Sequence, residues 1–244
     1  MKIINADWEK RNIGVTCKEV ILSTSDSITD LYDIISSFAD LYNHYFVFKI
    51  PNCMPQHIQL LTECGYIFAE TLFEVSLNVN EASVPSQIAR IDSLIKYREI
   101  LNADEFLSIS KEIEKGIFST DRIALNPNFG KTAASTRYNN WLNDEIANAT
   151  KIYEINYQTS PIGFFALKKL SEKEYDNFLA GMYLDHNNFG LGFSIITKPI
   201  EEVKKRGGDL ITTHISSNNL QVMRLYFKFG FLPKDIVYVM TKNS

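Results

Sequence analysis

The sequence is poor in cysteine. Only Cys17, Cys53 and Cys64 occur, all in the first third of the chain, and no two have the spacing of a CxxC motif. A sparse, odd set of thiols argues against a disulfide framework and against a zinc site. We therefore expect reduced thiols, no bound metal and a cytoplasmic location.

Long apolar runs and clustered positive charge are missing too. No apolar stretch approaches the ~20 residues of a membrane-spanning helix, and the opening "MKIINADWEKRN" lacks the apolar region of a signal peptide. Lysine and arginine are scattered, and the formal net charge is −4. A nucleic-acid-binding surface needs a basic face, so we expect neither nucleic acid nor membrane insertion.

What is present is the composition of a folded globular protein. Hydrophobic residues make up 45% of the 244 residues and charged residues 22%, which suffices for one large or two modest domains. Residues 79–87 are rich in turn formers and lack an apolar period, as a linker does. We expect a smaller domain at 1–80, a linker at 81–92 and a larger domain at 93–244.

Apolar periodicity predicts an α/β protein. Asn102 is placed to cap a helix, with Glu105 at the capping-box position, and the region 122–146 resists assignment beyond a helix around Tyr138 and Trp141. Strands are predicted at 20–23, 44–50, 66–77, 92–100, 151–157, 162–170, 177–186, 209–216 and 235–241, and further helices at 27–43, 55–65, 193–207 and 218–230.

The two parts of the chain share a pattern. Residues 60–77 and 225–242 align without a gap, with Gly65 on Gly230 and Tyr66 on Phe231. Any helix–glycine–strand unit has this look, so a relation between the parts and a chance likeness both stay open. In the alignment, Leu61 occupies the position of Tyr226.

Two stretches near the end are candidates for chemistry. The glycines of "NNFGLG", residues 187–192, stand between a strand and a helix, where backbone amides and the helix N-terminus attract an anion. The later helix carries Val222, Leu225, Tyr226 and Phe229 at the spacing of a core stripe. From spacing alone, Tyr226 is a buried aromatic.

Together these stretches resemble the motifs of GNAT (Gcn5-related) N-acyltransferases. The family pattern is Arg/Gln-x-x-Gly-x-Gly/Ala opening a helix, then Asn-x-x-Ala-x-x-x-Tyr, then Gly-Phe. The chain offers Asn187-x-x-Gly190-x-Gly192, then Asn219-x-x-Val222-x-x-x-Tyr226, then Gly230-Phe231. It departs from the pattern at Asn187, which replaces a long side chain, and at Val222, which replaces alanine.

The first part of the chain narrows the resemblance. A truncated leading half with Trp8 and Gly14, joined to a full GNAT domain, is similar to the dTDP-fucosamine acetyltransferases and related N-acyltransferases of nucleotide-linked amino sugars. This implies an α/β fold: a C-terminal GNAT fold with a mixed, mainly antiparallel twisted sheet flanked by helices, preceded by a smaller truncated GNAT-like half.

The resemblance also implies a co-substrate, acetyl-CoA or another short acyl-CoA, and a catalytic residue. Tyr226 would be the general acid that protonates the CoA thiolate, because a phenol with a pKa near 10 stays protonated at neutral pH. The residues that would bind the acyl-CoA are Met182, Leu184, Asn187, Asn188, Phe189, Gly190, Leu191, Gly192 and Asn219.

The sequence indicates the acceptor-binding residues less clearly. Arg122 and Arg137, with Lys131, could meet a nucleotide diphosphate, and Tyr138 or Trp141 could stack on a base or sugar. Alternatively, the aromatic residues close the seam between the two parts. The general base stays open between water and four side chains on or near the strands: Asp185, His186, His214 and Glu154.

The expected function is transfer of an acetyl or other short acyl group to the amine of a dTDP-linked aminodideoxy sugar, for bacterial lipopolysaccharide or O-antigen synthesis. A 3-hydroxybutanoyl group, a 3-amino sugar or another small amine are alternatives within the same class. A non-catalytic acyl-CoA sensor or scaffold is the alternative outside it. The expected partners are small molecules, and a homodimer stays open.

Overall fold

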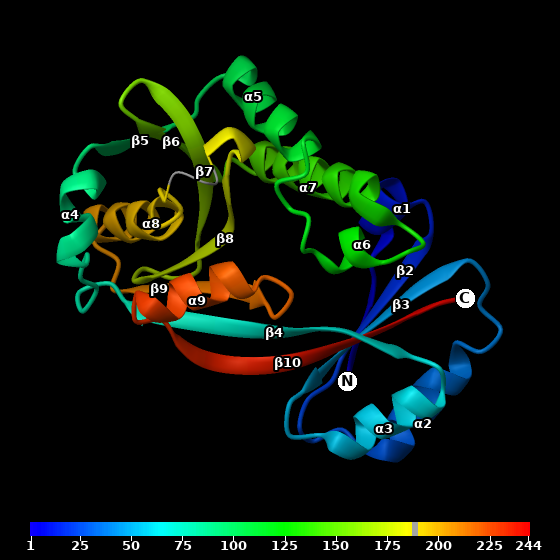
Figure 1. Cartoon of the computed structure of the whole chain (residues 1–244). Helices are drawn as coiled ribbons and strands as arrows, with labels where there is room; N and C mark the ends of the chain where they lie inside the picture. The colour runs from blue at the N-terminus through cyan, green and yellow to red at the C-terminus, as the bar shows by residue number, and fades with distance from the viewer. Residues whose placement is uncertain (187–189) are drawn as a thin grey trace.

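The computed structural model describes residues 1–186 and 190–244. In this part of the chain, ten strands form one sheet in the order β1-β2-β3-β10-β4-β9-β8-β7-β6-β5 (Figure 1). The strands are β1 (Lys2–Asn5), β2 (Thr16–Ile21), β3 (His44–Pro51), β4 (Ile67–Asn78), β5 (Ile95–Glu99), β6 (Lys151–Tyr157), β7 (Ser160–Lys169), β8 (Glu174–Met182), β9 (Leu210–Ser216) and β10 (Leu232–Asn243).

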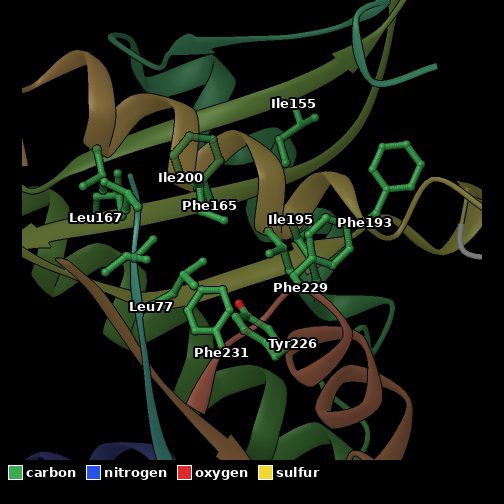
Figure 2. Close-up of a cluster of buried hydrophobic side chains, with 14 of the residues drawn as sticks. Leu77, Ile155, Phe165, Leu167, Phe193, Ile195, Ile200, Tyr226, Phe229 and Phe231 are labelled. Carbon is green, nitrogen blue, oxygen red and sulfur yellow. The ribbon is translucent and has the colours of Figure 1, made fainter. Parts of the chain in front are cut away.

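Helices cover both faces of this sheet. They are α1 (Asp7–Ile13), α2 (Ile28–Ser37), α3 (Pro55–Glu63), α4 (Ser86–Asp92), α5 (Ala103–Glu114), α6 (Arg122–Leu125), α7 (Gly130–Ala147), α8 (Ser194–Lys205) and α9 (Leu220–Lys228), with a short 3₁₀ turn at Leu184–His186. The largest buried cluster joins α8 and α9 to the middle strands, and Figure 2 shows Tyr226 within it beside Phe229 and Phe231.

The predicted α/β class is confirmed, and most elements lie within a few residues of their expected positions. The unassigned region 122–146 holds α6 and the long helix α7, and Asn102 caps α5 as predicted by accepting from the amide of Glu105. The pattern missed β1, α1 and α4, and the helix predicted at 27–43 already ends at Ser37.

The last strand lies among the first ones. β10 pairs antiparallel with β3 on one side and β4 on the other, and β4 in turn pairs with β9. The hydrogen bonds of the central strands therefore join residues from both sides of the expected linker 81–92, which itself contains α4. The division into domains 1–80 and 93–244 stays a prediction.

The register of β4 and β10 reveals an internal pseudo-twofold symmetry. The pair Leu232–Ser76 has its counterpart in Thr241–Ile67, at positions that the alignment of 60–77 with 225–242 makes equivalent. The two residues that the ladder skips, Lys234 in β10 and Ala69 in β4, are also equivalent. Two register shifts at equivalent positions of the two strands would rarely arise by chance.

The outer strands follow the same symmetry. The β4–β9 ladder begins at Leu72–Ser216, and the β10–β3 ladder begins at the equivalent pair Val237–Pro51. β2 runs parallel to β3 as β8 runs parallel to β9. In the described part of the chain, the remaining neighbouring strands are antiparallel. The chain thus contains two related halves built around one sheet.

Candidate active site

The middle of the sheet splits between β8 and β9. Their parallel ladder holds for three pairs, from Glu174–Leu210 to Asp176–Thr212. Beyond it β8 continues along β7 and β9 along β4, and the Thr213 hydroxyl donates to the Asn177 carbonyl at 2.8 Å. We call this separation the fork.

A cavity of about 420 Å³ opens at the fork. β8 and β9 contribute residues 177–180 and 213–216 to its wall, α9 contributes Asn219 and Tyr226, and Ile195 comes from the first turn of α8. The other wall includes all four predicted acceptor residues, Arg122, Arg137, Tyr138 and Trp141. The fold therefore brings the predicted acid and the predicted acceptor residues into one space.

Tyr226 is both a core residue and a polar one. Its side chain is 4% exposed, and its ring packs edge-on against Phe231 with the centroids 4.8 Å apart. Its hydroxyl oxygen accepts a hydrogen bond from Nδ2 of Asn177 at 3.2 Å. Burial raises the pKa of Tyr226 to about 12, so the phenol stays protonated and its own hydrogen can be donated into the cavity.

The loop before α8 has the features of an anion site. Gly190 has a φ of +70°, and a Cβ added at Gly190 or at Gly192 would meet nothing within 4 Å. The helix begins after Phe193, and none of the described side chains caps it. Of its first amides, those of Ser194 and Ile196 already donate to the carbonyls of Leu191 and Phe193, both at 3.0 Å. The positive end of the helix dipole still attracts negative charge. The described part of the loop thus fits a phosphate group.

The other residues predicted to bind acyl-CoA take different places. Leu191 and Met182 are buried in the core, where the Ser194 hydroxyl meets the Met182 sulfur at 3.6 Å, and the side chain of Leu184 is 39% exposed. Oδ1 of Asn219 caps α9 by accepting from Val222 N at 3.1 Å, which leaves its NH₂ group for the cavity. Asn187, Asn188 and Phe189 lie outside the described residues.

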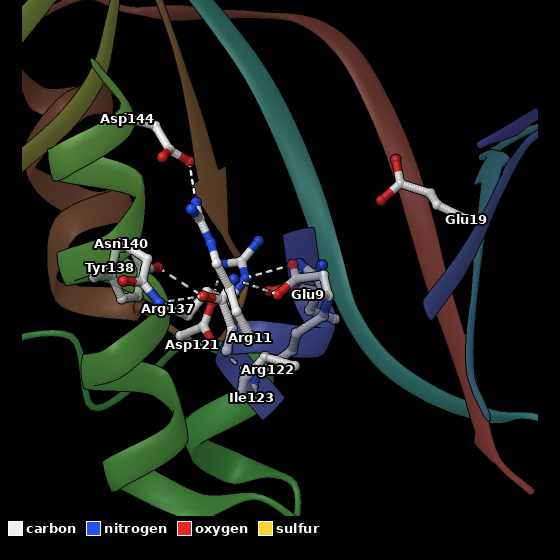
Figure 3. A network of polar contacts seen from close by, with 12 residues as sticks. Glu9, Arg11, Glu19, Asp121, Arg122, Ile123, Arg137, Tyr138, Asn140 and Asp144 are labelled. Carbon is white, nitrogen blue, oxygen red and sulfur yellow. Dashed lines mark hydrogen bonds and ion pairs between the residues drawn. The ribbon is translucent and has the colours of Figure 1, made fainter. Parts of the chain in front are cut away.

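Both predicted acceptor arginines are already ion-paired. Arg122 meets Glu70 at 3.3 Å. Arg137 meets Glu9 at 2.7 Å and Asp121 at 3.6 Å (Figure 3). The pair between Arg137 and Glu9 joins α7 to α1, as does the ion pair between Arg11 and Asp144 that Figure 3 also shows. Lys131 is exposed. These arginines therefore hold the two halves together as well as line the cavity.

An aromatic row forms one wall of the cavity. The ring of Tyr138 stacks on Phe118 at 4.1 Å and on Trp141 at 6.2 Å, and Trp141 reaches Phe178 of β8 at 5.4 Å. The Tyr138 hydroxyl donates to Asp121 at 3.1 Å. All four rings line the cavity, which gives it an apolar platform beside polar groups.

The structure separates the expected base candidates. Glu154 is buried and ion-paired with Arg98 at 2.7 Å, the side chain of Asp185 is 79% exposed, and the side chain of His186 lies outside the described residues. Of the four, His214 lies in the cavity wall.

Sequence reasoning missed two polar residues of the fork, Asp176 and Asn177. The available signal was their position side by side within the apolar strand "EYDNFLAGM". Burial raises the pKa of Asp176 to about 6. A raised pKa together with a place in the cavity wall marks Asp176 as a candidate functional residue.

Among the described residues, no group of three or more His, Cys, Asp or Glu side chains is placed to hold a metal ion. No helix in the same ranges is both long and apolar enough to span a bilayer.

No family model and no curated protein sequence matches this chain. Its fold, in contrast, matches solved structures along almost its whole length. The match to a GCN5-related N-acetyltransferase from Sphaerobacter thermophilus covers 99% of this chain and 75% of that protein's chain, with 10% identity and a TM-score of 0.66. The match to a tandem GNAT protein from the clavulanic acid biosynthesis pathway covers 94% of this chain and 75% of that protein's chain, with 10% identity and a TM-score of 0.58.

A third structure contains a sugar-modifying region. It is a GCN5-related glucosamine N-acetyltransferase region of a fungal multi-domain GH3 beta-N-acetylglucosaminidase. The match covers 99% of this chain and 31% of that protein's chain, with 11% identity and a TM-score of 0.65. Together the likenesses show that the chain has the GNAT fold, in an arrangement of two halves that fits the tandem structure. The dTDP-fucosamine branch stays a prediction.

Proposed function

We propose that the protein is an acyl-CoA-dependent N-acyltransferase that acylates the amine of a small amino sugar. The observation that carries this proposal is the place of Tyr226. Its protonated hydroxyl is held by Asn177 at the fork, in the cavity that also contains the predicted acceptor residues. Any buried tyrosine hydroxyl needs a polar partner. What sets Tyr226 apart is that its partner lies at the fork and that both residues line the cavity.

The acyl-CoA would bind along the fork. The described part of the loop, Gly190 to Gly192, and the uncapped start of α8 would hold the pyrophosphate through backbone amides. The edge of β8 that faces the fork would pair with the pantetheine arm, as an extended ligand adds to an open strand. The NH₂ group of Asn219 would donate to a carbonyl of that arm.

The reaction follows from these positions. The neutral amine attacks the thioester carbonyl, the carbon–sulfur bond breaks, and the leaving thiolate takes the proton of Tyr226. The tyrosine recovers a proton from the nitrogen of the new amide, so the protein is unchanged. A phenol with a pKa of about 12 cannot ionise on its own at neutral pH, and it serves as a donor.

The chemistry of the cavity supports a sugar as acceptor. Its wall combines the row of Phe118, Tyr138 and Trp141 with charged and hydroxyl side chains, and aromatic faces beside polar groups suit an amphiphilic sugar ring. A glucosamine N-acetyltransferase region is among the structures with the same fold. The dTDP-linked aminodideoxy sugar that the sequence resemblance favours is a second candidate acceptor.

The test is a thiol-release assay with purified protein. Acetyl-CoA and 3-hydroxybutanoyl-CoA would each be offered with glucosamine, a free 3-amino sugar, dTDP-4-amino-4,6-dideoxygalactose and spermidine. We expect saturable release of CoA with at least one amino sugar and the N-acyl product by mass spectrometry. Thermal stabilisation by acetyl-CoA without thiol release from any amine would favour a sensor and contradict the proposal.

A further inference from the structure

Asp176 is the last residue of β8 before the fork. It lies in the cavity wall, and its Oδ1 atom is buried without a hydrogen-bond partner among the described residues. A buried carboxylate oxygen that lacks a partner loses the hydrogen bonds that water would give it. Such a group persists at a functional site when a ligand supplies the missing donor.

The other half of the sheet shows how the same position is satisfied when no ligand is needed. By the internal symmetry, Glu19 of β2 is equivalent to Asp176, because each pairs across the ladder with equivalent residues, Val47 and Thr212. Glu19 forms an ion pair at 2.6 Å with Lys49 of β3. The residue equivalent to Lys49 is His214, so the second half has replaced the permanent cation.

Charged groups from four elements face Asp176, and they do not neutralise it. They are His214 of β9, Lys168 of β7, Glu74 of β4 and Glu145 of α7. The ammonium of Lys168 lies 2.8 Å from Glu145, which occupies it. In the described ranges, no lysine or arginine is within 4.0 Å of the Asp176 carboxylate. The site thus offers a carboxylate that is ready for a cation.

The cations of the same cavity are, in contrast, ion-paired, and of their nitrogen atoms Nε of Arg122 is buried without a hydrogen-bond partner among the described residues. Lys49 is paired with Glu19, Arg122 with Glu70, and Arg137 with both Glu9 and Asp121. For Lys49 and Arg137, an ion pair must break before the group can neutralise a phosphate, and an unpaired carboxylate would be left behind. The charge of the cavity therefore suits a positive ligand.

We propose that Asp176 selects the acceptor by binding its amine as an ammonium ion at the fork and removing its proton, so that amines without a phosphate group are preferred. This inference rests on the proposed function and adds the substrate class to it. Asp176 would be a catalytic residue, because it touches the reacting nitrogen.

The proton balance is complete. The ammonium gives one proton to the Asp176 carboxylate, which passes it to solvent through the open cavity, and the neutral amine attacks the thioester. The nitrogen gives its second proton to Tyr226, which replaces the proton that Tyr226 delivered to the thiolate. The products are the amide, CoA thiol and one released proton, with no other reactant.

The test compares two amines that differ by a phosphate, glucosamine and glucosamine 6-phosphate, in wild type and in Asp176→Asn. We expect wild type to prefer glucosamine by roughly tenfold or more in kcat/KM, because like charges repel the phosphate. We expect the variant to lose on the order of 10²–10⁴-fold in kcat/KM for glucosamine at pH 7, and to lose the preference.

The pH dependence separates this role from a structural one. In wild type, kcat/KM should fall below about pH 6, where Asp176 becomes protonated. In Asp176→Asn the limb near pH 6 should be replaced by one at the pKa of the amine itself, so activity should partly recover at high pH, where the amine is neutral in solution. Asp209→Asn makes the same change at the exposed start of β9 and should behave as wild type.

The outcomes are distinguishable from failure of the proposed function. Unchanged turnover in Asp176→Asn, or a wild-type preference for the phosphorylated amine, overturns the inference alone. If wild type acylates no amine, the proposed function fails. Titration of the Asp176 carboxyl by ¹³C NMR then tests the inference about Asp176 by itself. A pKa near 6 supports a carboxylate awaiting a cation, and an ordinary value near 4 overturns it.

Discussion

The ladder between β2 and β3 runs for six pairs, from Thr16–His44 to Ile21–Lys49, whereas the equivalent ladder between β8 and β9 stops after three. The first half of the sheet is therefore closed where the second half forks. The halves differ there in backbone as well as in side chains. The β7–β8 ladder shifts register between Ala166–Leu179 and Lys168–Asp176, whereas the β1–β2 ladder runs without a shift.

Three polar groups of the fork have apolar counterparts in the first half. Where the second half has Asn177, Thr213 and Tyr226, the first has Val20, Phe48 and Leu61, all three fully buried. The closed half shows that this backbone packs without a phenol, an amide or a hydroxyl at these positions. We attribute their presence in the open half to the proposed ligand.

The N-termini of α2 and α8, the equivalent helices of the two halves, also differ. α2 begins with a capping box, in which Ser27 and Asp30 satisfy each other's backbone amides. No described side chain caps α8, and the glycines before it leave open space. One helix start is sealed by its own residues, while the other can receive an anion.

The largest expected effect comes from the phenol. Tyr226→Phe should lower kcat by on the order of 10²–10⁴ with little change in acetyl-CoA affinity, because the ring packing stays and only the proton donor is lost. Steady-state and single-turnover thiol release would measure it. Tyr66→Phe removes a buried phenol from the closed half and should leave the rate unchanged, and equal effects of the two variants would contradict the comparison.

The two equivalent carboxylates should respond oppositely to neutralisation. Burial raises the pKa of Asp176 to about 6, so wild type loses stability as the pH rises from about 4 to 6. Asp176→Asn should therefore be more stable above pH 6, by on the order of 2 kcal/mol, and no more stable below pH 4.

Glu19→Gln provides the matched measurement in the closed half. It breaks the ion pair with Lys49 and should lower stability at pH 7 by roughly 1 kcal/mol. Urea unfolding at pH 4 and pH 7 would give both values. A loss of stability in Asp176→Asn at pH 7 would show that the carboxylate is part of the scaffold.

Backbone freedom in the loop is the next contrast. Gly190→Val places a side chain at a φ of +70°, which costs roughly 1–2 kcal/mol, and should weaken acetyl-CoA binding about tenfold. Gly14→Val makes the same change at a φ of +79°, after α1. Calorimetric titration should show normal acetyl-CoA affinity for Gly14→Val, and equal affinities in the two variants would remove the loop from the binding site.

The smallest effects concern the helix caps. Ser27→Ala and Asn219→Ala each remove a side chain that caps a helix, and each should lower stability by about 1 kcal/mol. Only Asn219→Ala should also raise the KM for acetyl-CoA, since the Asn219 side chain lines the cavity as well. An unchanged KM would limit Asn219 to capping.

The sequence allowed much of this arrangement to be predicted where the signal is local. The short motifs contain Gly190, Gly192, Asn219 and Tyr226. The alignment of the two helix–glycine–strand units made Leu61 the equivalent of Tyr226. The interleaving of β10 between β3 and β4 could not be predicted, because strand pairing depends on contacts between residues far apart in the chain.

Asp176 was missed for a similar reason. Its importance depends on which residue lies on the neighbouring strand, a histidine in this half and Lys49 in the other. The arginines of the acceptor site were expected to be free cations. Their partners Glu9 and Glu70 come from the first half, more than fifty positions away, and only the fold brings them together.

Hydrogen–deuterium exchange with and without acetyl-CoA tests the central contrast most directly. We predict that acetyl-CoA slows exchange in residues 177–182 of β8 and 190–197 at the start of α8, while the equivalent β2 and the start of α2 are unaffected. Equal protection of both halves, or protection only at the start of α2, would contradict the assignment of the open half as the binding site.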